Sequence, residues 1–328
     1  MKVSDVGEWK IIETIFEVIN KKKRLALPYG DDAIALKLTR NINLVMNVDM
    51  LVGKTDVPPG MSAIQIGKKV VTMSVSDLAA KGAKPMGFLS SIGLRRDMDL
   101  EYLIEVYKGM NIAARKYNMY ILGGDTNETD DLIIDGISFG IAKNVISRSG
   151  AKIGDIVAIT GLFGNTSAGF KILFENLYAP QKLKNKILKD IYEPKGYVKE
   201  GIVLAKKGLV NASIDSSDGL AISLYEIAKK SNVGIEINML PITEEAKKFA
   251  EMNNIDPLEL VFYGGEEYVL ILTIERTKWT KAQNEIKKIG GKLIPIGKVI
   301  EDKNVIIYKC EGKEIFIEKR GWEHFKHK

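Results

Sequence analysis

The chain has 328 residues, of which 45% are hydrophobic and 27% are charged, and this ordinary globular composition excludes a disordered chain and a fibrous one. At about 150 residues per domain, the length predicts two domains that can each bury a core. The net charge of +6 comes from lysines in scattered groups, which is more typical of solvated helix faces than of a nucleic-acid groove.

The sequence offers almost no thiol or imidazole chemistry. Cys310 is the only cysteine, and the two histidines, His324 and His327, lie in the last five residues. An intrachain disulfide and a cysteine metal cluster are therefore excluded, and chemistry in the body of the chain must proceed without imidazole. No apolar run approaches the ~20 residues that span a bilayer, and no signal-peptide pattern opens the chain. We therefore expect a cytoplasmic protein without a membrane or nucleic-acid partner.

Helices and strands alternate in the first half. In chain order the pattern predicts a helix over 6–20, strands over 33–38 and 42–48, helices over 63–80 and 100–117, and strands over 120–122 and 132–142. Ser62 can cap the helix over 63–80, which ends near Gly82. Asp32 comes before the first of the strands, and Asp49 is expected just after the second.

A polar stretch over 147–155 separates two strand-like runs and is the expected domain boundary. We expect one domain over 1–146 and another over 147–328. The second half predicts a strand over 156–159, helices to about residue 207, a strand, turn and helix over 212–230, and strands over 269–274, 293–299 and 304–308. Mixed helices and strands in both halves favour two α/β (α+β) domains over a barrel of alternating units.

Carboxylates at turns are the informative pattern. Acidic residues follow a glycine, or border a strand, at Asp31, Asp32, Asp49, Asp125, Asp215, Asp218, Glu266 and Glu267. Strand ends are where α/β folds place ligands, and glycine lets the backbone approach one closely. Any single member could simply stabilise a turn or cap a helix, but the whole set favours a binding site.

Asp77 lies on the apolar face of the helix over 63–80, at helical spacing from Val70 and Met73. A buried carboxylate is costly unless it is paired, hydrogen-bonded or bound to a cation. A buried lysine or arginine is one possible partner, and a metal ion is the other. Without histidine or cysteine, oxygen ligands would suit Mg²⁺.

The familiar nucleotide-binding motifs are missing. Gly53, Lys54 and Thr55 match only the end of a P-loop, because Val48 stands where that loop needs its first glycine. The glycines that follow residue 160 form no dinucleotide-binding pattern and could make either a flexible turn or a phosphate contact.

Seven short motifs, in this order, resemble a known family. They are Gly30-Asp31-Asp32-Ala33, Asn47-Val48-Asp49-Met50-Leu51-Val52, Ser76-Asp77-Leu78-Ala79-Ala80-Lys81-Gly82-Ala83, Gly123-Gly124-Asp125-Thr126, Arg148-Ser149-Gly150-Ala151, Asp215-Ser216-Ser217-Asp218-Gly219-Leu220 and Gly264-Gly265-Glu266-Glu267-Tyr268. With the ending Gly321-Trp322-Glu323-His324-Phe325, they resemble the thiamine-monophosphate kinases. These belong to a wider ATP-binding superfamily that includes aminoimidazole ribonucleotide synthetase and selenophosphate synthetase.

The resemblance covers nearly the whole chain and implies an architecture and a reaction. It implies an N-terminal α/β domain that forms a dimeric barrel through its strands, a C-terminal α+β domain, and ATP bound between them in a homodimer. The implied reaction converts ATP and thiamine monophosphate to ADP and thiamine diphosphate. The attacking phosphate oxygen is already ionised at neutral pH, so the reaction needs no general base and no covalent phosphoenzyme.

The same resemblance assigns roles to individual residues. Several Mg²⁺ ions would be held by Asp32, Asp49, Asp77, Asp125, Asp215 and Asp218. Nucleotide contacts would come from Tyr107, Gly124, Asp125, Arg148 and Ser217, with Asp125 and Arg148 acting in catalysis. The acceptor would meet Asp56, Glu266 and Trp322. Arg148 and the metal ions would screen the repulsion between two phosphate groups.

Three positions depart from the family pattern. The family usually has hydroxyl residues where Asn47 and Val48 stand, and commonly a substrate-contacting histidine where Asp56 stands. An aspartate repels a phosphate unless a cation lies between them. We expect that Lys54 or another base takes over the phosphate contact, the alternative being a different substrate.

Two other functions stay open at this stage. The chain could be another ATP-dependent enzyme of the same superfamily, although a selenium enzyme would carry a reactive cysteine near its N-terminus. It could also be a nucleotide-binding or Mg²⁺-binding protein without turnover, with the three departures as signs of decay.

Overall fold

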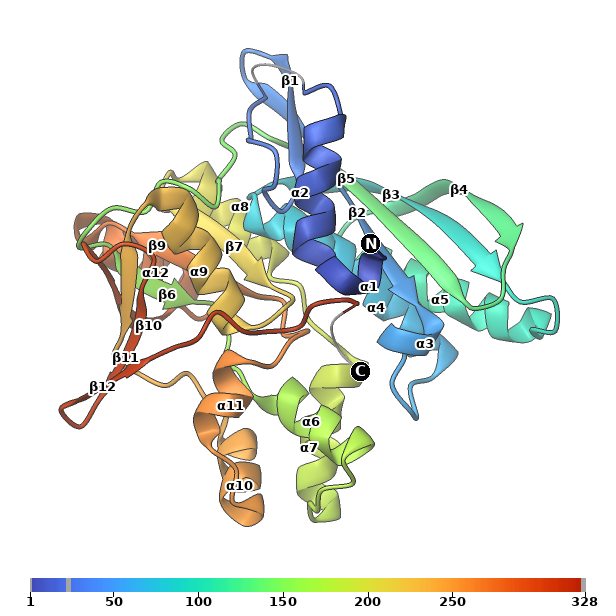
Figure 1. The fold of residues 1–328 in the computed structure, drawn as a ribbon. Helices are drawn as coiled ribbons and strands as arrows, with labels where there is room; N and C mark the ends of the chain where they lie inside the picture. Colours follow the sequence, from blue (N-terminus) through green and yellow to red (C-terminus); the bar gives the residue numbers. More distant parts are fainter. Residues whose placement is uncertain (1, 22–24, 326–328) are drawn as a thin grey trace.

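The computed structural model describes residues 2–21 and 25–325, and it contains two β-sheets with helices around them (Figure 1). The first sheet has five strands in the order β1-β2-β5-β3-β4. Their bounds are β1 Ile34–Thr39, β2 Ile42–Val52, β3 Lys84–Leu94, β4 Tyr120–Glu128 and β5 Ile133–Ala142. The β3–β4 pair is parallel, and the other neighbours are antiparallel.

One face of this sheet is covered by helix α4 (Ala63–Ala80), which packs against α5 (Leu100–Lys116). A capping box begins α4, because the Ser62 side chain accepts a hydrogen bond from the Gln65 main chain. The two helices approach closely where each has a glycine. A Cβ atom at Gly67 would lie 1.9 Å from the carbonyl oxygen of Val106, so this contact requires glycine.

The opposite face of the five-stranded sheet is apolar and exposed. Strand β5 alternates between buried and half-buried residues, as expected when only one face of a strand is covered. Large apolar side chains on this sheet are exposed to solvent, including Val48 at 61% exposure and Met50 at 56%. Among the described residues, no element packs over these two side chains.

The second sheet has seven strands in the order β12-β11-β8-β10-β6-β9-β7. Their bounds are β6 Ile156–Ile159, β7 Ala212–Ser216, β8 Gly234–Ile237, β9 Val269–Ile274, β10 Ile294–Ile300, β11 Ile306–Cys310 and β12 Lys313–Phe316. The remaining helices are α1 Val3–Val6, α2 Glu8–Val18, α3 Gly53–Asp56, α6 Asn165–Phe174, α7 Gln181–Tyr192, α8 Val198–Lys206, α9 Leu220–Ser231, α10 Glu244–Asn253, α11 Pro257–Phe262, the 3₁₀ turn η1 Arg276–Lys278 and α12 Trp279–Lys288.

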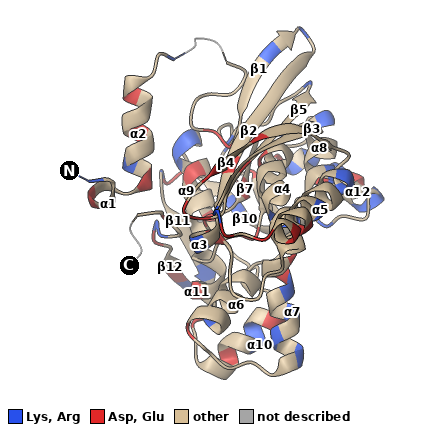
Figure 2. Ribbon diagram, turned by 90° about the vertical axis from the view of Figure 1, so that its right-hand side faces the viewer, with Lys and Arg blue, Asp and Glu red and all other residues tan. Residues whose placement is uncertain are grey.

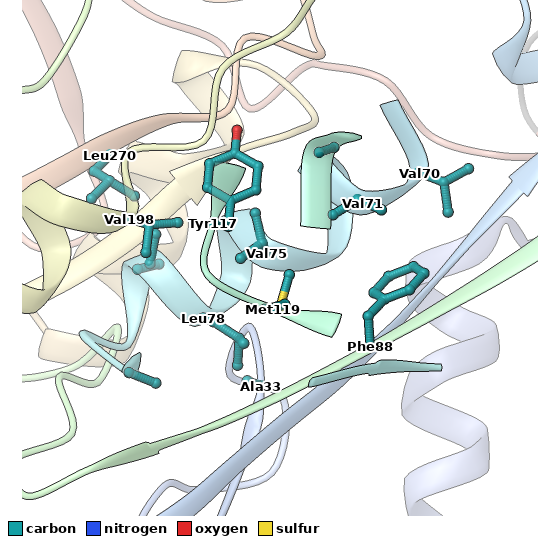
Figure 3. Packing of buried hydrophobic residues seen from close by; sticks show 14 of the residues in the cluster. Ala33, Val70, Val71, Val75, Leu78, Phe88, Tyr117, Met119, Val198 and Leu270 are labelled. Atoms are coloured by element: carbon teal, nitrogen blue, oxygen red, sulfur yellow. The ribbon is translucent and has the colours of Figure 1, made fainter. Parts of the chain in front are cut away.

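The main hydrophobic core crosses from one half of the chain to the other (Figure 3). Val75 and Leu78 of α4 belong to the same buried cluster as Val198 of α8 and Leu270 of β9. Helix α4 therefore contributes to the cores of both halves. Several acidic positions lie in the middle of the molecule in Figure 2, and the outer helices α7 and α12 carry several lysines.

The expected two-domain α/β class is confirmed, and the helix over 63–80 has the expected bounds. Two predicted strands are too short. Strand β2 continues to Val52, so Asp49 lies inside it rather than after its end, and β4 runs through Gly124 to Glu128. Strand β3 was not expected, because proline and two glycines interrupt its apolar pattern; pairing with β5 over most of its length overrides that weak propensity.

Five elements of the second half also escaped the sequence pattern, namely the strands β8 and β12 and the helices α10, α11 and α12. None of the described helices combines the length and the apolar character that a membrane crossing requires.

Candidate active site

Three carboxylates from separate elements meet between the two sheets. Asp32 lies in the turn before β1, Asp77 near the end of α4 and Asp215 on β7, and one carboxylate oxygen from each lies within 4.8 Å of the others. The side chain of Asp32 has no exposed surface, and Asp215 is 6% exposed. The fold thus gathers three of the six acids that the sequence assigned to metal binding, from both halves of the chain.

Asn47 connects a fourth acid to this group. Its side-chain amide donates to Asp77 Oδ2 at 2.8 Å and to Asp49 Oδ2 at 3.0 Å, while its Oδ1 accepts from the Ser138 hydroxyl at 2.5 Å. An amide has two N–H donors, whereas a serine or threonine hydroxyl has only one. This departure from the family pattern therefore bridges both acids at once. Its neighbour Val48 points to the exposed face of the sheet.

Burial raises the pKa values of these carboxyl groups, and their mutual repulsion adds to the effect. The pKa of Asp77 lies well above its usual value, because the group is buried and faces Asp49 and Asp215. Burial is the larger cause and repulsion by neighbouring acids the smaller one; together they raise the pKa of Asp49 to about 7 and that of Asp215 to about 6. Removal from solvent likewise raises the pKa of Asp218 to about 7. A cation bound among them would favour their ionised forms.

Two cationic side chains close one side of the acidic cluster. Lys81 is fully buried, with Nζ 2.5 Å from Asp31 Oδ1 and 2.7 Å from Asp32 Oδ2. The Arg148 guanidinium forms an ion pair with Asp32 and donates to the carbonyl of Gly30 at 3.2 Å. Burial opposes the charge of Arg148, but the carboxylates of Asp32 and Asp31 raise its pKa, so the guanidinium stays charged.

The donor set fits Mg²⁺. The acidic cluster consists of five carboxyl groups, those of Asp32, Asp49, Asp77, Asp215 and Asp218. Ligation by oxygen alone suits a hard divalent cation. Of these five acids, only Asp32 forms ion pairs with the two nearby cations, Lys81 and Arg148. The remaining carboxyls have no ion pair with the described residues, so the cluster has a surplus of acidic groups that metal ions would balance.

Asp125 lies apart from the buried acids. Strand register places Asp49, Gly136, Ser90 and Gly124 in one row across β2, β5, β3 and β4. Asp125 is the next residue along β4, so its side chain projects from the opposite face of the sheet, and it is exposed. The metal and nucleotide roles assigned to Asp125 therefore stay predictions.

The predicted nucleotide contacts Tyr107, Gly124 and Ser217 occupy three different elements. Tyr107 on α5 is partly buried and packs against the main core. A Cβ atom at Gly124 would lie 1.9 Å from the carbonyl oxygen of Ser90, so β3 and β4 require glycine there. Ser217 lies between β7 and α9, and its carbonyl oxygen accepts a hydrogen bond from the main-chain N–H of Glu266 at 2.6 Å.

Trp322 reaches the acidic cluster through its main chain. Its N–H donates to the carbonyl of Asp218 at 3.1 Å. The indole is 42% exposed and meets the ring of His324 edge-on at 5.8 Å. His327 lies outside the described residues.

The structure places Asp56 and Lys54 in positions that the sequence did not suggest. The Asp56 carboxylate turns back to accept from the Val52 main-chain N–H at 2.7 Å. Lys54 is exposed, and its main-chain N–H donates to Asp131. The base that contacts residue 56 is instead Lys69, whose Nζ donates to the main-chain carbonyl of Asp56 at 2.7 Å.

Sequence reasoning assigned no role to Lys69 or Lys81, although both lie on the buried side of α4 or at its end. Lys69 follows Ile66 by three residues, and Lys81 follows Asp77 by four. A charged residue at helical spacing on an apolar face was the signal that singled out Asp77, and it applies equally to these two lysines.

Comparison with known proteins places the whole chain in one group. The N-terminal domain model of the AIR synthase related proteins matches residues 30–142, and the corresponding C-terminal model matches residues 152–309. A thiamine-monophosphate kinase from Pyrococcus abyssi is 39% identical over 90% of both chains. A second, from Nitrosopumilus maritimus, is 33% identical over 99% of this chain and 100% of its own. The solved structure "AaThiL complexed with AMPPCP and TMP" superposes with a TM-score of 0.86, at 26% identity over 99% of both chains.

Proposed function

Because the chain belongs to the thiamine-monophosphate kinase family, we propose that it transfers the γ-phosphoryl group of ATP to thiamine monophosphate, giving ADP and thiamine diphosphate. The observation that carries this proposal is the cluster of Asp32, Asp77 and Asp215, whose carboxylate oxygens lie within 4.8 Å of one another. A site that must hold two polyphosphate anions together needs bound cations more than it needs a base.

The transfer is a direct displacement. An oxygen of the acceptor phosphate attacks the γ-phosphorus, the bond from that phosphorus to the bridging oxygen of ADP breaks, and the oxygen keeps the electron pair. Bound Mg²⁺ would supply neutralisation of the phosphate charges. The residues proposed to hold it are Asp32, Asp49, Asp77, Asp215 and Asp218, with Asp125 contributed from β4.

Arg148 is proposed to stabilise the transferring group. Its guanidinium is 19% exposed at the edge of the cluster and remains charged beside Asp32. Guanidinium donors match phosphate oxygens in charge and geometry. The ion pair with Asp32 holds this side chain in place before a nucleotide binds, so that less rotational freedom is lost on binding.

The nucleotide is proposed to meet Tyr107, Gly124 and Ser217, and the organic part of the acceptor is proposed to meet Glu266 and Trp322. The exposed indole of Trp322, which lies next to Asp218 in the fold, has a face on which an aromatic ring can stack. The Glu266 carboxylate can balance a cationic ring.

We further propose that two copies of the chain pair through their five-stranded sheets. Val48 and Met50 belong to an exposed apolar sheet face, and exposed patches of this kind usually mark an interface. Asp125 projects from the same face, since it shares a row with Asp135 and Met50. We therefore propose that Asp125 contributes to the site only when two copies of the chain are paired.

An ADP-release assay coupled to NADH oxidation tests the proposed activity. Release from ATP and Mg²⁺ should require thiamine monophosphate, and thiamine without its phosphate should not replace it. The product should be identified as thiamine diphosphate by chromatography. ADP release independent of the acceptor, or none with any acceptor while ATP still binds, would favour another superfamily reaction or a binding protein.

A further inference from the structure

A fully buried lysine joins the two halves of the chain beside the acidic cluster. The Lys69 side chain on α4 is 1% exposed, and its Nζ lies 2.6 Å from Glu266 Oε1, before β9. The same ammonium donates to the main-chain carbonyl of Asp56 at 2.7 Å. A buried ammonium is tolerated only with such partners, so the two contacts account for its burial.

The Glu266 backbone is held in an unusual conformation. Glu266 has φ 64° and Tyr268 has φ 54°, in the left-handed region that non-glycine residues seldom adopt. Residues in such conformations persist where their surroundings fix them, and they concentrate at functional sites. Here the main-chain N–H of Glu266 donates to Ser217 and its side chain pairs with Lys69. These two contacts determine where the carboxylate lies.

One oxygen of this carboxylate has no partner. Glu266 Oε2 is buried and accepts no hydrogen bond from the described residues, whereas Oε1 is engaged by Lys69. Buried carboxylate oxygens are normally satisfied. The side chain as a whole is 23% exposed although Oε2 itself is covered, so a ligand can approach the exposed part of this side chain. Ser217, which anchors its main chain, lies between the proposed metal ligands Asp215 and Asp218.

We propose that Lys69 is a positioning residue for the acceptor substrate. Its ammonium occupies one oxygen of Glu266 and thereby fixes the position of the carboxylate beside which the cationic ring of thiamine monophosphate binds. By bonding the Asp56 carbonyl, it also fixes α3, where the family commonly has a substrate-contacting histidine. The inference rests on the proposed function, which supplies the identity of the acceptor. Lys69 acts through Glu266 and does not itself touch the substrate.

The test compares KM values for the two substrates. Lys69→Met and Glu266→Gln should each raise the KM for thiamine monophosphate at least tenfold and leave the KM for ATP within twofold. Because Lys69 acts through Glu266, the double variant should be no worse than the worse single variant. The matched control is Lys68→Met, which removes the neighbouring charge from a side chain that is 30% exposed and pairs with Glu193 at 3.5 Å; both of its KM values should stay unchanged.

Thermal unfolding of each variant establishes that it is folded. If Lys69→Met does not fold because Glu266 is left unpaired, Lys69→Gln takes its place; its amide is polar, but it is shorter than the lysine side chain and uncharged, so it does not hold Glu266 and the Asp56 carbonyl as the ammonium does, and a rise in the acceptor KM alone is again expected. An unchanged acceptor KM in a folded variant, an equal rise for both substrates, or additive losses in the double variant would overturn the inference. Calorimetric binding of thiamine monophosphate to the wild type separates the two proposals: if it neither binds nor reacts, the proposed function fails and this inference with it.

Discussion

Glu267 should make the protein less stable as the pH rises through neutrality. Its carboxylate is buried next to the start of α6, where Oε1 accepts from the Thr166 hydroxyl at 2.5 Å and Oε2 accepts no hydrogen bond from the described residues. Burial raises its pKa from 4.5 to about 8, although Thr166 and the main-chain N–H of Gly164 oppose the rise. The native state thus holds this proton more tightly than the unfolded state does.

The sign of the effect follows from proton linkage. Below pH 4.5 both states are protonated, so the group does not change the free energy of unfolding; between 4.5 and about 8 only the unfolded state loses its proton, and stability falls. The slope is about 1.4 kcal/mol per pH unit, which gives an upper limit of about 5 kcal/mol above pH 8. Glu267→Gln has no proton to lose, so its stability relative to the wild type should increase across this range.

Urea unfolding at half-unit steps from pH 5 to pH 9, with metal ions removed, measures this difference. The matched control is Glu175→Gln at the other end of α6, whose side chain is 55% exposed and pairs with Lys171 at 3.0 Å; its stability should follow that of the wild type at every pH. Parallel curves for Glu267→Gln and the wild type would refute the reasoning, because they would mean that Glu267 is already ionised in the native protein near pH 5.

Further predictions concern the acidic cluster, the helix contact and the exposed sheet. Asp77→Asn and Asp125→Asn should each lower kcat at least a hundredfold without loss of the circular dichroism spectrum, because they remove ligand charge and little volume; near wild-type kcat at limiting Mg²⁺ would contradict the metal assignment. Gly67→Ala should lower the free energy of unfolding by about 1–3 kcal/mol in urea, since its Cβ would lie 1.9 Å from a carbonyl oxygen of α5. Val48→Asp should convert a dimer to a monomer in sedimentation velocity, and a wild type that is already monomeric at micromolar concentration would remove the basis for the proposed pairing.

The sequence predicted the structure well where the signal lies within a few neighbouring residues. The capped helix over 63–80 and the inward position of Asp77 both follow from helical spacing and a serine cap. The structure has the capped helix, and it places Asp77, half-buried, in the acidic cluster. The residues that contact Asp77 could not be predicted from local spacing. Its contacts are Asn47, from a strand 30 positions earlier, and acids from β2 and β7, which only the packing of α4 between two sheets brings together.

The positions of Lys69 and Asp56 show a second limit. The sequence located a departure from the family at residue 56 and suggested Lys54, the nearest base along the chain. In the structure Asp56 satisfies a main-chain donor of its own turn, and the base beside it comes from α4 and pairs with a residue 197 positions away. Separation in sequence hid a contact that depends on the docking of the two halves.

The core that α4 shares between both halves constrains the engineering of this protein. Val75 and Leu78 pack in one cluster with Val198 and Leu270, so neither half retains its full apolar packing when separated from the other. A chimera that joins the N-terminal half of one relative to the C-terminal half of another would place unmatched side chains across this buried seam, and overpacked or underfilled cores lose stability quickly. Functional hybrids should therefore require that α4 be exchanged together with the residues of α8 and β7 that contact it.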